Sequence, residues 1–381
     1  MIEIFLGACL GFVVSVVGLR MALGIGPSRN SYREAVAYGL VVCLAAGLNF
    51  EFGVFAQKDA SQFAFDLFHG RESARGNQTF LIQAILNAPG YVITETWWVA
   101  IGTNIGIAAG TLAYARRFLG SGAWVFYAPA VVNFLLFALR DPLIGLMMLG
   151  LAVSLVRAAD LEDWIPRKKE LSLAGALLFS RPEAALIYGA ARAGQLAHSV
   201  KGRKARLLLI PVGVGALIMF LSVAPRAIGI EDSGGVGAAP TVLNDTFVQR
   251  AGRNVGGFGS GSDILGGALK GLPVVLRYPV QLVTFFILPL PWEIRSFEHA
   301  LAALDSAFFA IAFVAFWRRA PRPLRGLMVL YVLGIAFFAH NYGNLFRLRM
   351  PAYFIIMAAF RSGAADAQSL RGESGIEQGA L

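Results

Sequence analysis

The chain has few charged residues and few cysteines for its length. Of its 381 residues only 15% are charged, whereas a soluble domain carries about 25%. Its two cysteines, Cys9 and Cys43, both lie inside apolar runs and are expected to be small buried hydrophobes, so no disulfide framework is indicated. The sequence has no HExxH motif, CxxC cluster or GxSxG motif, and we predict neither a metal site nor a cofactor.

Long hydrophobic runs recur from one end of the sequence to the other. Hydrophobic residues make up 57% of the chain, and the 29 Phe and 43 Gly residues suit tight helix packing in lipid. Runs of about 17 or more apolar residues are typical of membrane-spanning helices. We therefore expect an all-α, polytopic integral membrane protein. The apolar runs are 4–25, 35–56, 97–114, 123–139, 142–156, 171–180, 183–198, 207–225, 272–290, 300–317, 325–341 and 350–361.

The basic loops between these runs predict the orientation. Lys and Arg favour cytoplasmic loops, and the basic loops all fall on one side if the first run begins outside. The formal net charge of +10 follows from these loops, so we expect no nucleic-acid binding. The expected location is the bacterial inner membrane, with a periplasmic N-terminus and a cytoplasmic C-terminus. The basic loops are 29–33, 116–117, 157–169, 201–206 and 318–325.

Two runs need special treatment for this orientation to hold. The run 171–180 is too short to cross about 30 Å of hydrocarbon as a helix, so 171–199 is expected to form a pair of short or tilted helices broken at Arg181. The run 272–290 is expected to be re-entrant or interfacial. About eleven crossings result. The expected parts are one transmembrane domain over 1–362, extracytoplasmic loops at 57–96 and 226–299, and a disordered cytoplasmic tail at 363–381.

Arginines stand at breaks between apolar runs, on the side of the membrane where arginine should be scarce. Such ionisable groups usually bind a charged ligand or take part in chemistry. Guanidinium groups bind phosphate in a bidentate way, so these arginines predict a diphosphate clamp. A local ion pair at a helix start is the alternative for Arg140-Asp141 and for Arg181-Glu183, and snorkelling is the alternative for Arg277. The predicted substrate-binding residues are Arg140, Arg181, Arg277, Asn341, Asn344, Arg347 and Arg349.

Acidic and imidazole groups near these arginines are candidates for proton transfer. A general base must accept the proton of an attacking hydroxyl, and the segment 340–351 also offers amides that suit sugar hydroxyls. The acids inside apolar runs, chiefly Glu51 and Asp305, are too scattered to suggest a proton relay. The predicted catalytic residues are Asp59, Asp141, Glu183 and His340.

Four segments carry a resemblance to a known family. They are NFLLFALRDPLI at 133–144, FSRPEA at 179–184, LPLPWE at 288–293 and NYGNLFRLRMP at 341–351. In their order they resemble bacterial Wzy-type polysaccharide polymerases of exopolysaccharide and O-antigen clusters. The resemblance implies an all-helical, inverting glycosyltransferase related to the GT-C group and to O-antigen ligases. Its implied substrates are undecaprenyl-diphosphate-linked oligosaccharides, which are joined at the periplasmic face.

The function expected from these observations is polymerisation of polyprenyl-diphosphate-linked repeat units. The expected partners are that lipid-linked glycan, membrane lipid and other polysaccharide-assembly proteins. One alternative is a GT-C enzyme that uses a polyprenyl-monophosphate sugar. Another is a flippase for lipid-linked glycans, although a transporter normally carries its broken helices near the midplane of the membrane, whereas here the charged breaks lie at one face.

Overall fold

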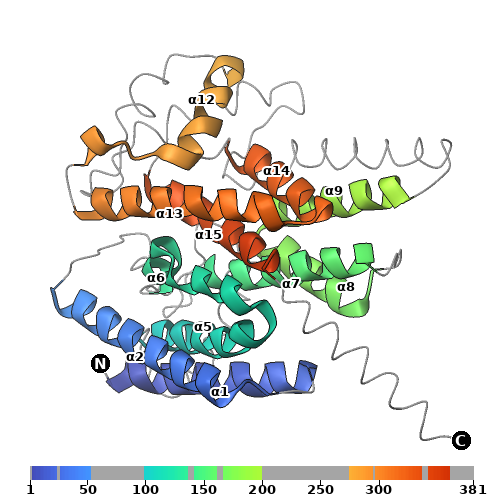
Figure 1. Ribbon diagram of the computed structural model, residues 1–381. Coiled ribbons are helices and arrows are strands. Elements are labelled where there is room, and N and C mark those ends of the chain that lie inside the picture. Colours follow the sequence, from blue (N-terminus) through green and yellow to red (C-terminus); the bar gives the residue numbers. More distant parts are fainter. Residues whose placement is uncertain are drawn as a thin grey trace, which may run out of the picture.

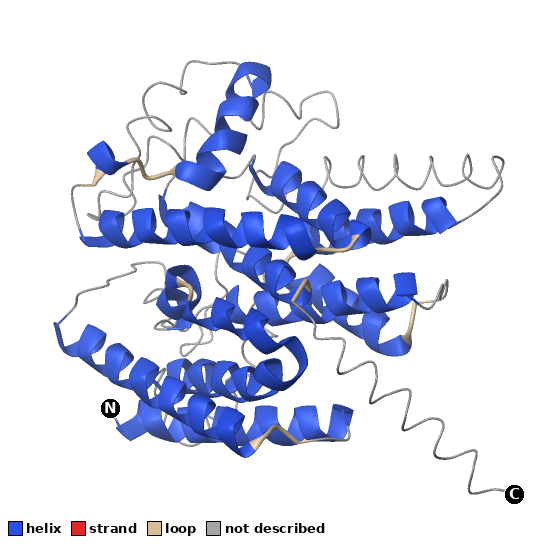
Figure 2. Cartoon of the chain, viewed as in Figure 1, coloured by secondary structure: helices blue, strands red, loops and turns tan. Residues whose placement is uncertain are grey.

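The described part of the chain folds entirely into helices. In the computed structural model it comprises residues 2–23, 26–52, 98–135, 141–160, 166–199, 274–294, 297–336 and 342–360. No strand occurs in these ranges (Figure 2). The predicted all-α fold class is confirmed to that extent.

The helices form a stack (Figure 1). α1, α2 and α5 lie together at one side of the molecule, α12, α13 and α14 lie at the other, and α6, α7, α8 and α15 lie between them, with α15 packed against both α7 and α13. Short 3-10 helices occur at Gly120–Tyr127 and Pro291–Glu293. The α-helices are α1 (Ile2–Leu23), α2 (Arg29–Phe52), α5 (Trp98–Leu119), α6 (Pro129–Leu135), α7 (Asp141–Asp160), α8 (Lys168–Ser180), α9 (Pro182–Ser199), α12 (Val274–Ile287), α13 (Phe297–Arg319), α14 (Arg322–Ala336) and α15 (Tyr342–Ala358).

Two of the described helices are long and apolar enough to cross a membrane. They are Ile2–Met21 within α1 and His299–Arg319 within α13. α2 and α5 are of similar length, with 24 and 22 residues, which corresponds to about 33–36 Å of helix. α1 also carries large apolar side chains on its outer surface, among them Val13 and Val14, each 56% exposed. α1 and α13 therefore indicate membrane association. The sequence predicts about eleven crossings, and the other crossings remain a prediction.

α1 and α5 pack so closely that their backbones touch. A Cβ atom added to Gly7 would lie 2.3 Å from the carbonyl oxygen of Val99, and one added to Gly106 would lie 2.1 Å from that of Ala8. Only glycine fits such contacts. Because Gly7 pairs with Val99 near the start of α5 and Ser15 pairs with Gly110 further along it, the two helices run parallel. Small residues at a close helix crossing are typical of membrane proteins.

α2 packs against α5 in the opposite direction. Glu34, near the start of α2, pairs with Arg116, near the end of α5, at 2.7 Å. Further along α2, a Cβ atom at Gly39 would contact Ala109. The Tyr38 hydroxyl donates to the carbonyl oxygen of Phe126 at 2.9 Å, which fixes α2 against the following 3-10 helix. α1, α2 and α5 therefore form one up–down–up unit.

The apolar run 123–139 is not one helix, and its prediction as a single span is wrong. The chain instead forms the 3-10 helix Gly120–Tyr127, an extended residue at Ala128 with a ψ of 137°, and the short helix α6. Pro129 explains the break. A residue before proline avoids the helical region, and proline itself favours the first position of a new helix.

The start of α15 also differs from the prediction. The sequence placed a polar connection at 340–351 and began the last run at 350, whereas α15 begins at Tyr342 and contains Pro351. The polar segment is amphipathic when helical, because Leu345 and Leu348 are both buried. Tertiary packing of these side chains outweighs the loss of one backbone hydrogen bond at the proline.

The segments 171–199 and 272–290, which were not expected to cross the membrane as ordinary single helices, contain short helices. α8 has 13 residues and α9 has 18, with Arg181 alone between them, so the predicted break lies where the sequence indicated. α12 has 14 residues, about 21 Å, and stands at a steep angle to α13 (Figure 1). Trp292, just after α12, is 72% exposed, as an interfacial anchor would be.

Candidate functional site

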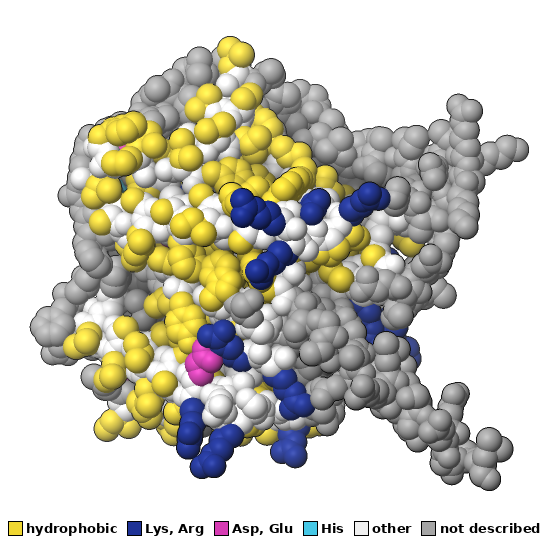
Figure 3. All heavy atoms as spheres, viewed as in Figure 1, with side chains coloured by type: hydrophobic (Ala, Val, Ile, Leu, Met, Phe, Trp, Pro, Cys, Tyr) yellow, Lys and Arg dark blue, Asp and Glu magenta, His cyan; other side chains and the backbone are white. Residues whose placement is uncertain are grey.

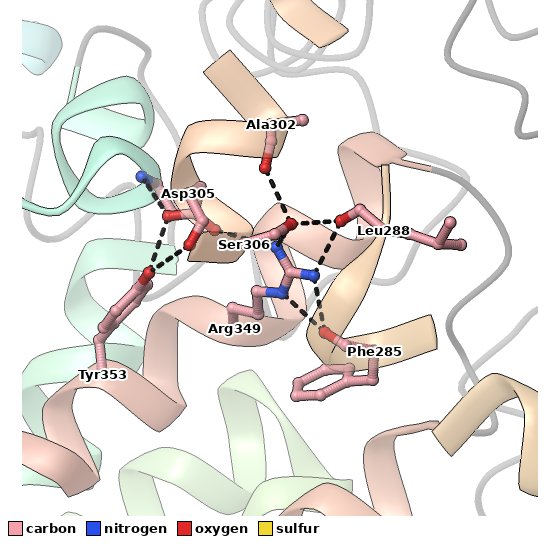
Figure 4. A network of polar contacts seen from close by, with 8 residues as sticks. Phe285, Leu288, Ala302, Asp305, Ser306, Arg349 and Tyr353 are labelled. Atoms are coloured by element: carbon pink, nitrogen blue, oxygen red, sulfur yellow. Dashed lines mark hydrogen bonds and ion pairs between the residues drawn. The ribbon is translucent and has the colours of Figure 1, made fainter. Parts of the chain in front are cut away.

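A buried arginine, Arg349, lies at the centre of a polar network between the last helices. Its side chain is only 1% exposed. Nε and Nη2 donate to the carbonyl oxygen of Phe285 at 2.9 and 2.7 Å, and Nη2 also donates to that of Leu288 at 3.0 Å. Nη1 donates to Ser306 Oγ at 2.7 Å and to Asp305 Oδ2 at 3.2 Å (Figure 4). All five N–H groups of the guanidinium are therefore used by the protein.

The carbonyl oxygens that accept from Arg349 lie at the end of a helix. α12 ends at Ile287, so Phe285 is among its last residues, whose carbonyl groups have no partner within the helix. Leu288 follows directly. A cation at this position satisfies these groups and interacts favourably with the helix dipole. Arg349 thus acts as a C-terminal cap for α12 although it belongs to α15.

Asp305 completes the network from α13. It is fully buried, and its Oδ1 accepts the Tyr353 hydroxyl at 2.9 Å and the backbone N–H of Ala130 at 3.0 Å (Figure 4). Ala130 lies in the first turn of α6, where N–H groups lack intrahelical acceptors. The carboxylate is therefore bonded on both oxygens, and the network joins α6, α12, α13 and α15.

The network lies inside the apolar part of α13. Asp305 is six residues beyond His299, where the candidate span begins, a distance of about 9 Å along the helix axis. A buried ion pair at such a depth is stable only when its remaining groups are hydrogen-bonded, and here they are. Phe285 and Phe309 also lie near the guanidinium, with ring centroids at 5.8 and 5.6 Å.

This pairing was not predicted from the sequence, where Asp305 is an isolated acid and Arg349 is expected to bind the substrate. The usable signal was the position of Asp305 inside an apolar run, because ionisable residues there are almost always paired. The phosphate contact predicted for Arg349 stays a prediction, and in this arrangement it would require one of the observed hydrogen bonds to break.

Arg347 lies on the other side of α15 from Arg349. Two residues correspond to about 200° around a helix, and seven residues to nearly two full turns. Arg347 therefore shares a face with Phe354, whose ring packs over Gly145 of α7. Its side chain is partly exposed, in contrast to the buried Arg349. The geometry separates the two arginines into one that is buried in the polar network and one that lies on the face of α15 shared with Phe354.

Arg181 is held between α8 and α9 by the residue pair that the sequence suggested. Its Nε lies 2.8 Å from Glu183 Oε1, and the Arg181 side chain is 9% exposed. The carbonyl oxygen of Arg181 accepts the backbone N–H of Ala184, in the first turn of α9. Glu183 lies in the first turn of α9, where a carboxylate is favoured by the helix dipole. The helix-start ion pair, offered as the alternative, is therefore present.

A second buried charge group lies deeper between α8 and α9. Glu170 Oε1 accepts the Tyr188 hydroxyl at 2.6 Å and Arg192 Nε at 3.2 Å. Arg192 also donates to Gln195, which in turn donates to the carbonyl oxygen of Leu155 in α7. These residues were not singled out in the sequence, where Glu170 adjoins a basic loop. They fasten the short helices to each other and to α7.

Arg277 belongs to a buried polar face of α12. Arg277, Gln281 and Thr284 are 2%, 0% and 3% exposed. Their spacing of four and then three residues puts them on one face of the helix. Arg277 is therefore buried rather than extended to an interface, which removes the snorkelling explanation. Its predicted contact with the substrate stays a prediction.

Several predicted site residues lie outside the described ranges. Asp59, Arg140, His340 and Asn341 are among them, so their predicted roles are unchanged. Asp141 and Asn344 are placed at the starts of α7 and α15 as backbone only. In the ranges that the structure describes, no group of three or more His, Cys, Asp or Glu residues could hold a metal ion.

No protein-family model matches this chain, and neither a curated protein nor a solved structure does.

Proposed function

We propose that the chain is a polytopic protein of the bacterial inner membrane with about eleven crossings. The directions of the helices support this arrangement. α1 and α5 run parallel to each other and α2 runs antiparallel to both, so the chain between α2 and α5 begins and ends on the same side. α13 and α15 also run parallel, because Asp305 pairs with Arg349 and Arg319 lies over the ring of Phe360.

The basic residues support the same orientation. α1, α5, α7 and α13 each carry arginine in the last turn, and none of the described helices α1, α5 and α13 has a basic residue near its start. In Figure 3, dark blue side chains gather where α13 ends and α14 begins and where α2 begins. In the proposed orientation all these ends are cytoplasmic, so the starts of α13 and α15 lie at the periplasmic face, with the N-terminus.

The function we propose is polymerisation of oligosaccharide repeat units carried on a polyprenyl diphosphate. The acceptor hydroxyl attacks the anomeric carbon of the donor glycan, the bond from that carbon to the diphosphate oxygen breaks, and the configuration inverts. The diphosphate leaves with the electron pair of the broken bond, and the acceptor proton passes to a base. Arginines that neutralise the departing diphosphate stabilise the transition state electrostatically.

The observation that supports this proposal is the contrast between two arginines of α15. Every N–H of the Arg349 guanidinium donates to the protein, which fixes the outer half of the helix. Arg347, two residues away, lies on the face of the helix that includes Phe354, and Phe354 packs on α7. In the proposed orientation α7 begins at the same outer face, directly after Arg140. Arg347 and Arg140 would then bind the diphosphate between α7 and α15, with Arg181 at the α8–α9 break as a further candidate.

The choice of base follows from the same contacts. Glu183 already accepts a hydrogen bond from Arg181 at 2.8 Å, so one of its carboxylate oxygens is occupied. Asp141 stands at the start of α7, beside the proposed diphosphate site. Asp59 and His340 are kept as candidates from the sequence. The proposal therefore favours Asp141 over Glu183.

Loss of the protein tests the proposed reaction. A deletion strain should accumulate single repeat units on the lipid carrier or on the final acceptor in the periplasmic leaflet, because flipping continues. The purified protein should convert lipid-linked units to longer chains. Units trapped in the cytoplasmic leaflet would contradict polymerisation and support the flippase, and transfer from a polyprenyl monophosphate would support the single-sugar enzyme.

Thiol labelling tests the orientation. After Cys9 and Cys43 are replaced by alanine, single cysteines are placed at Pro321 and Trp292, both of which are exposed. An impermeant reagent applied to intact spheroplasts should label position 292 and spare position 321 until the membrane is opened. Labelling of position 321 from outside would contradict the proposed orientation.

A further inference from the structure

The turn between α13 and α14 concentrates positive charge. Arg318 and Arg319 end α13, and Arg322 and Arg325 belong to the first turn of α14. Arg318, Arg319 and Arg322 are exposed. In the described part of the chain, none of the four arginines is paired with a carboxylate. Three exposed arginines and the half-buried Arg325 therefore lie within eight residues, with no carboxylate partner among the described residues.

Aromatic rings adjoin these arginines. Arg325 lies over the ring of Trp317 at 5.7 Å, and Arg319 lies over the ring of Phe360 at 4.9 Å. Trp317 is itself 42% exposed. An exposed tryptophan beside arginines is typical of the level at which lipid headgroups meet hydrocarbon.

Each helix of this turn carries an exposed apolar stripe that ends at an arginine. On α13 the stripe is Ile311, Val314 and Arg318, spaced by three and four residues. On α14 it is Arg322, Val329 and Leu333, spaced by seven and four. These spacings put each set on one helix face, and the four apolar side chains are between 38% and 71% exposed. The stripes extend about 10–17 Å from the arginines, close to half the thickness of the hydrocarbon.

We propose that Arg318 and Arg322, together with Trp317 and the apolar stripe that leads to each arginine, bind an anionic phospholipid of the cytoplasmic leaflet. The arginines would contact the headgroup phosphate, and the stripes would hold the acyl chains. Figure 3 shows dark blue side chains adjoining yellow apolar ones at this end of α13. A soluble phosphate would match the arginines but not the stripes, so the combination favours a lipid. The inference rests on the proposed membrane placement and not on glycosyl transfer.

The test uses the full-length protein in detergent micelles that contain phosphatidylglycerol or phosphatidylcholine, with bound lipid counted by native mass spectrometry. We expect phosphatidylglycerol to bind in preference to phosphatidylcholine. The double variant Arg318→Gln/Arg322→Gln should weaken phosphatidylglycerol binding by about thirty-fold, because each arginine near an anionic lipid strengthens binding by about five-fold. Its melting temperature in phosphatidylcholine should match that of the wild type, because both side chains are exposed.

A matched control variant removes two other arginines on the proposed cytoplasmic side. Arg117 and Arg157 are exposed and end α5 and α7, and no large apolar side chain of these two helices is exposed in the described residues. Arg117→Gln/Arg157→Gln should leave phosphatidylglycerol binding nearly unchanged. The proposed site would be overturned if this control variant lost as much phosphatidylglycerol binding as Arg318→Gln/Arg322→Gln, or if the wild type bound both lipids equally.

A truncation separates the lipid from the chain's own tail. Residues 362–381 contain Asp366, Glu373 and Glu377, which offer negative charge near the end of α15. Removal of this segment should leave the lipid preference intact. If only the truncated protein prefers phosphatidylglycerol, the tail occupies the surface and the lipid proposal is overturned.

Discussion

The two sides of the molecule are held together in different ways. In α1, α2 and α5 the contacts are made by glycine, with backbone against backbone at Gly106 and Ala8, and the ion pair between Glu34 and Arg116 lies at the edge. In α12 to α15 the contacts surround a fully buried ion pair, Asp305 with Arg349. Glycine packing needs only two complementary helices, whereas the charged network ties together four.

The difference indicates where function is expected. A glycine interface buries no charge and offers no polar group to a ligand, so its role is to hold α1 and α5 together in lipid. A buried ion pair adds little net stability compared with apolar packing. It does fix α6, α12, α13 and α15 relative to one another, and a binding site needs such support for its side chains. The proposed function accordingly treats α1 and α5 as the scaffold and the starts of α7 and α15 as the site.

Removal of Arg349 should have the largest effect on stability. Arg349→Met leaves Asp305 charged and buried without its partner, which typically costs about 3–5 kcal/mol. We expect a large fall in the denaturant midpoint of the purified protein and in its abundance in the membrane.

A second substitution provides the control for that loss. Asp305→Asn removes the charge and keeps an acceptor for Tyr353 and Ala130, so Arg349→Met combined with Asp305→Asn should recover at least about 1 kcal/mol relative to Arg349→Met alone. Strictly additive effects of the two substitutions would show that the pair is not coupled, in disagreement with the contacts described.

A methyl group at the glycine interface should have the next largest effect. In Gly106→Ala the new Cβ would lie 2.1 Å from the carbonyl oxygen of Ala8, and a helix must shift to admit it, at about 1–3 kcal/mol. Gly18→Ala in α1 is the matched control, because a Cβ there meets nothing within 4 Å. Thermal unfolding in detergent measures both. Equal stability of the two variants would contradict the backbone contact.

The edge pair of the scaffold should matter least. Glu34 and Arg116 are 2.7 Å apart, but their side chains are 29% and 33% exposed, and partly exposed ion pairs are worth about 0.2–1 kcal/mol. Glu34→Gln should lower stability by no more than this, and the difference should shrink at high salt. A loss as large as that of Arg349→Met would remove the contrast between the two regions.

Helices with clear boundaries were predictable from the sequence, and a buried break was not. The run 4–25 matches α1 within two residues at each end, because apolar length and flanking polar residues set both limits. The run 123–139 failed because Pro129 divides it into a 3-10 helix and α6. The early start of α15 was missed because burial of Leu345 and Leu348 outweighs the polar residues around them.

The positions of the charged residues were predictable, but their partners were not. Arg181 and Glu183 are two residues apart, so their ion pair could be anticipated from local spacing. Asp305 and Arg349 are separated by 44 residues, and nothing local to either indicates the other. The opposite faces of Arg347 and Arg349 became visible only once their segment was known to be helical.

We propose that Arg347 binds the substrate whereas Arg349 stabilises the fold. Substitution of Arg347 tests this difference most directly. In Arg347→Lys the charge remains and the planar fork is lost. We predict a melting temperature equal to that of the wild type and a rate of polymer formation from lipid-linked repeat units that is about ten- to hundred-fold lower. A wild-type rate from Arg347→Lys and from Arg347→Ala, at equal protein abundance, would contradict the account.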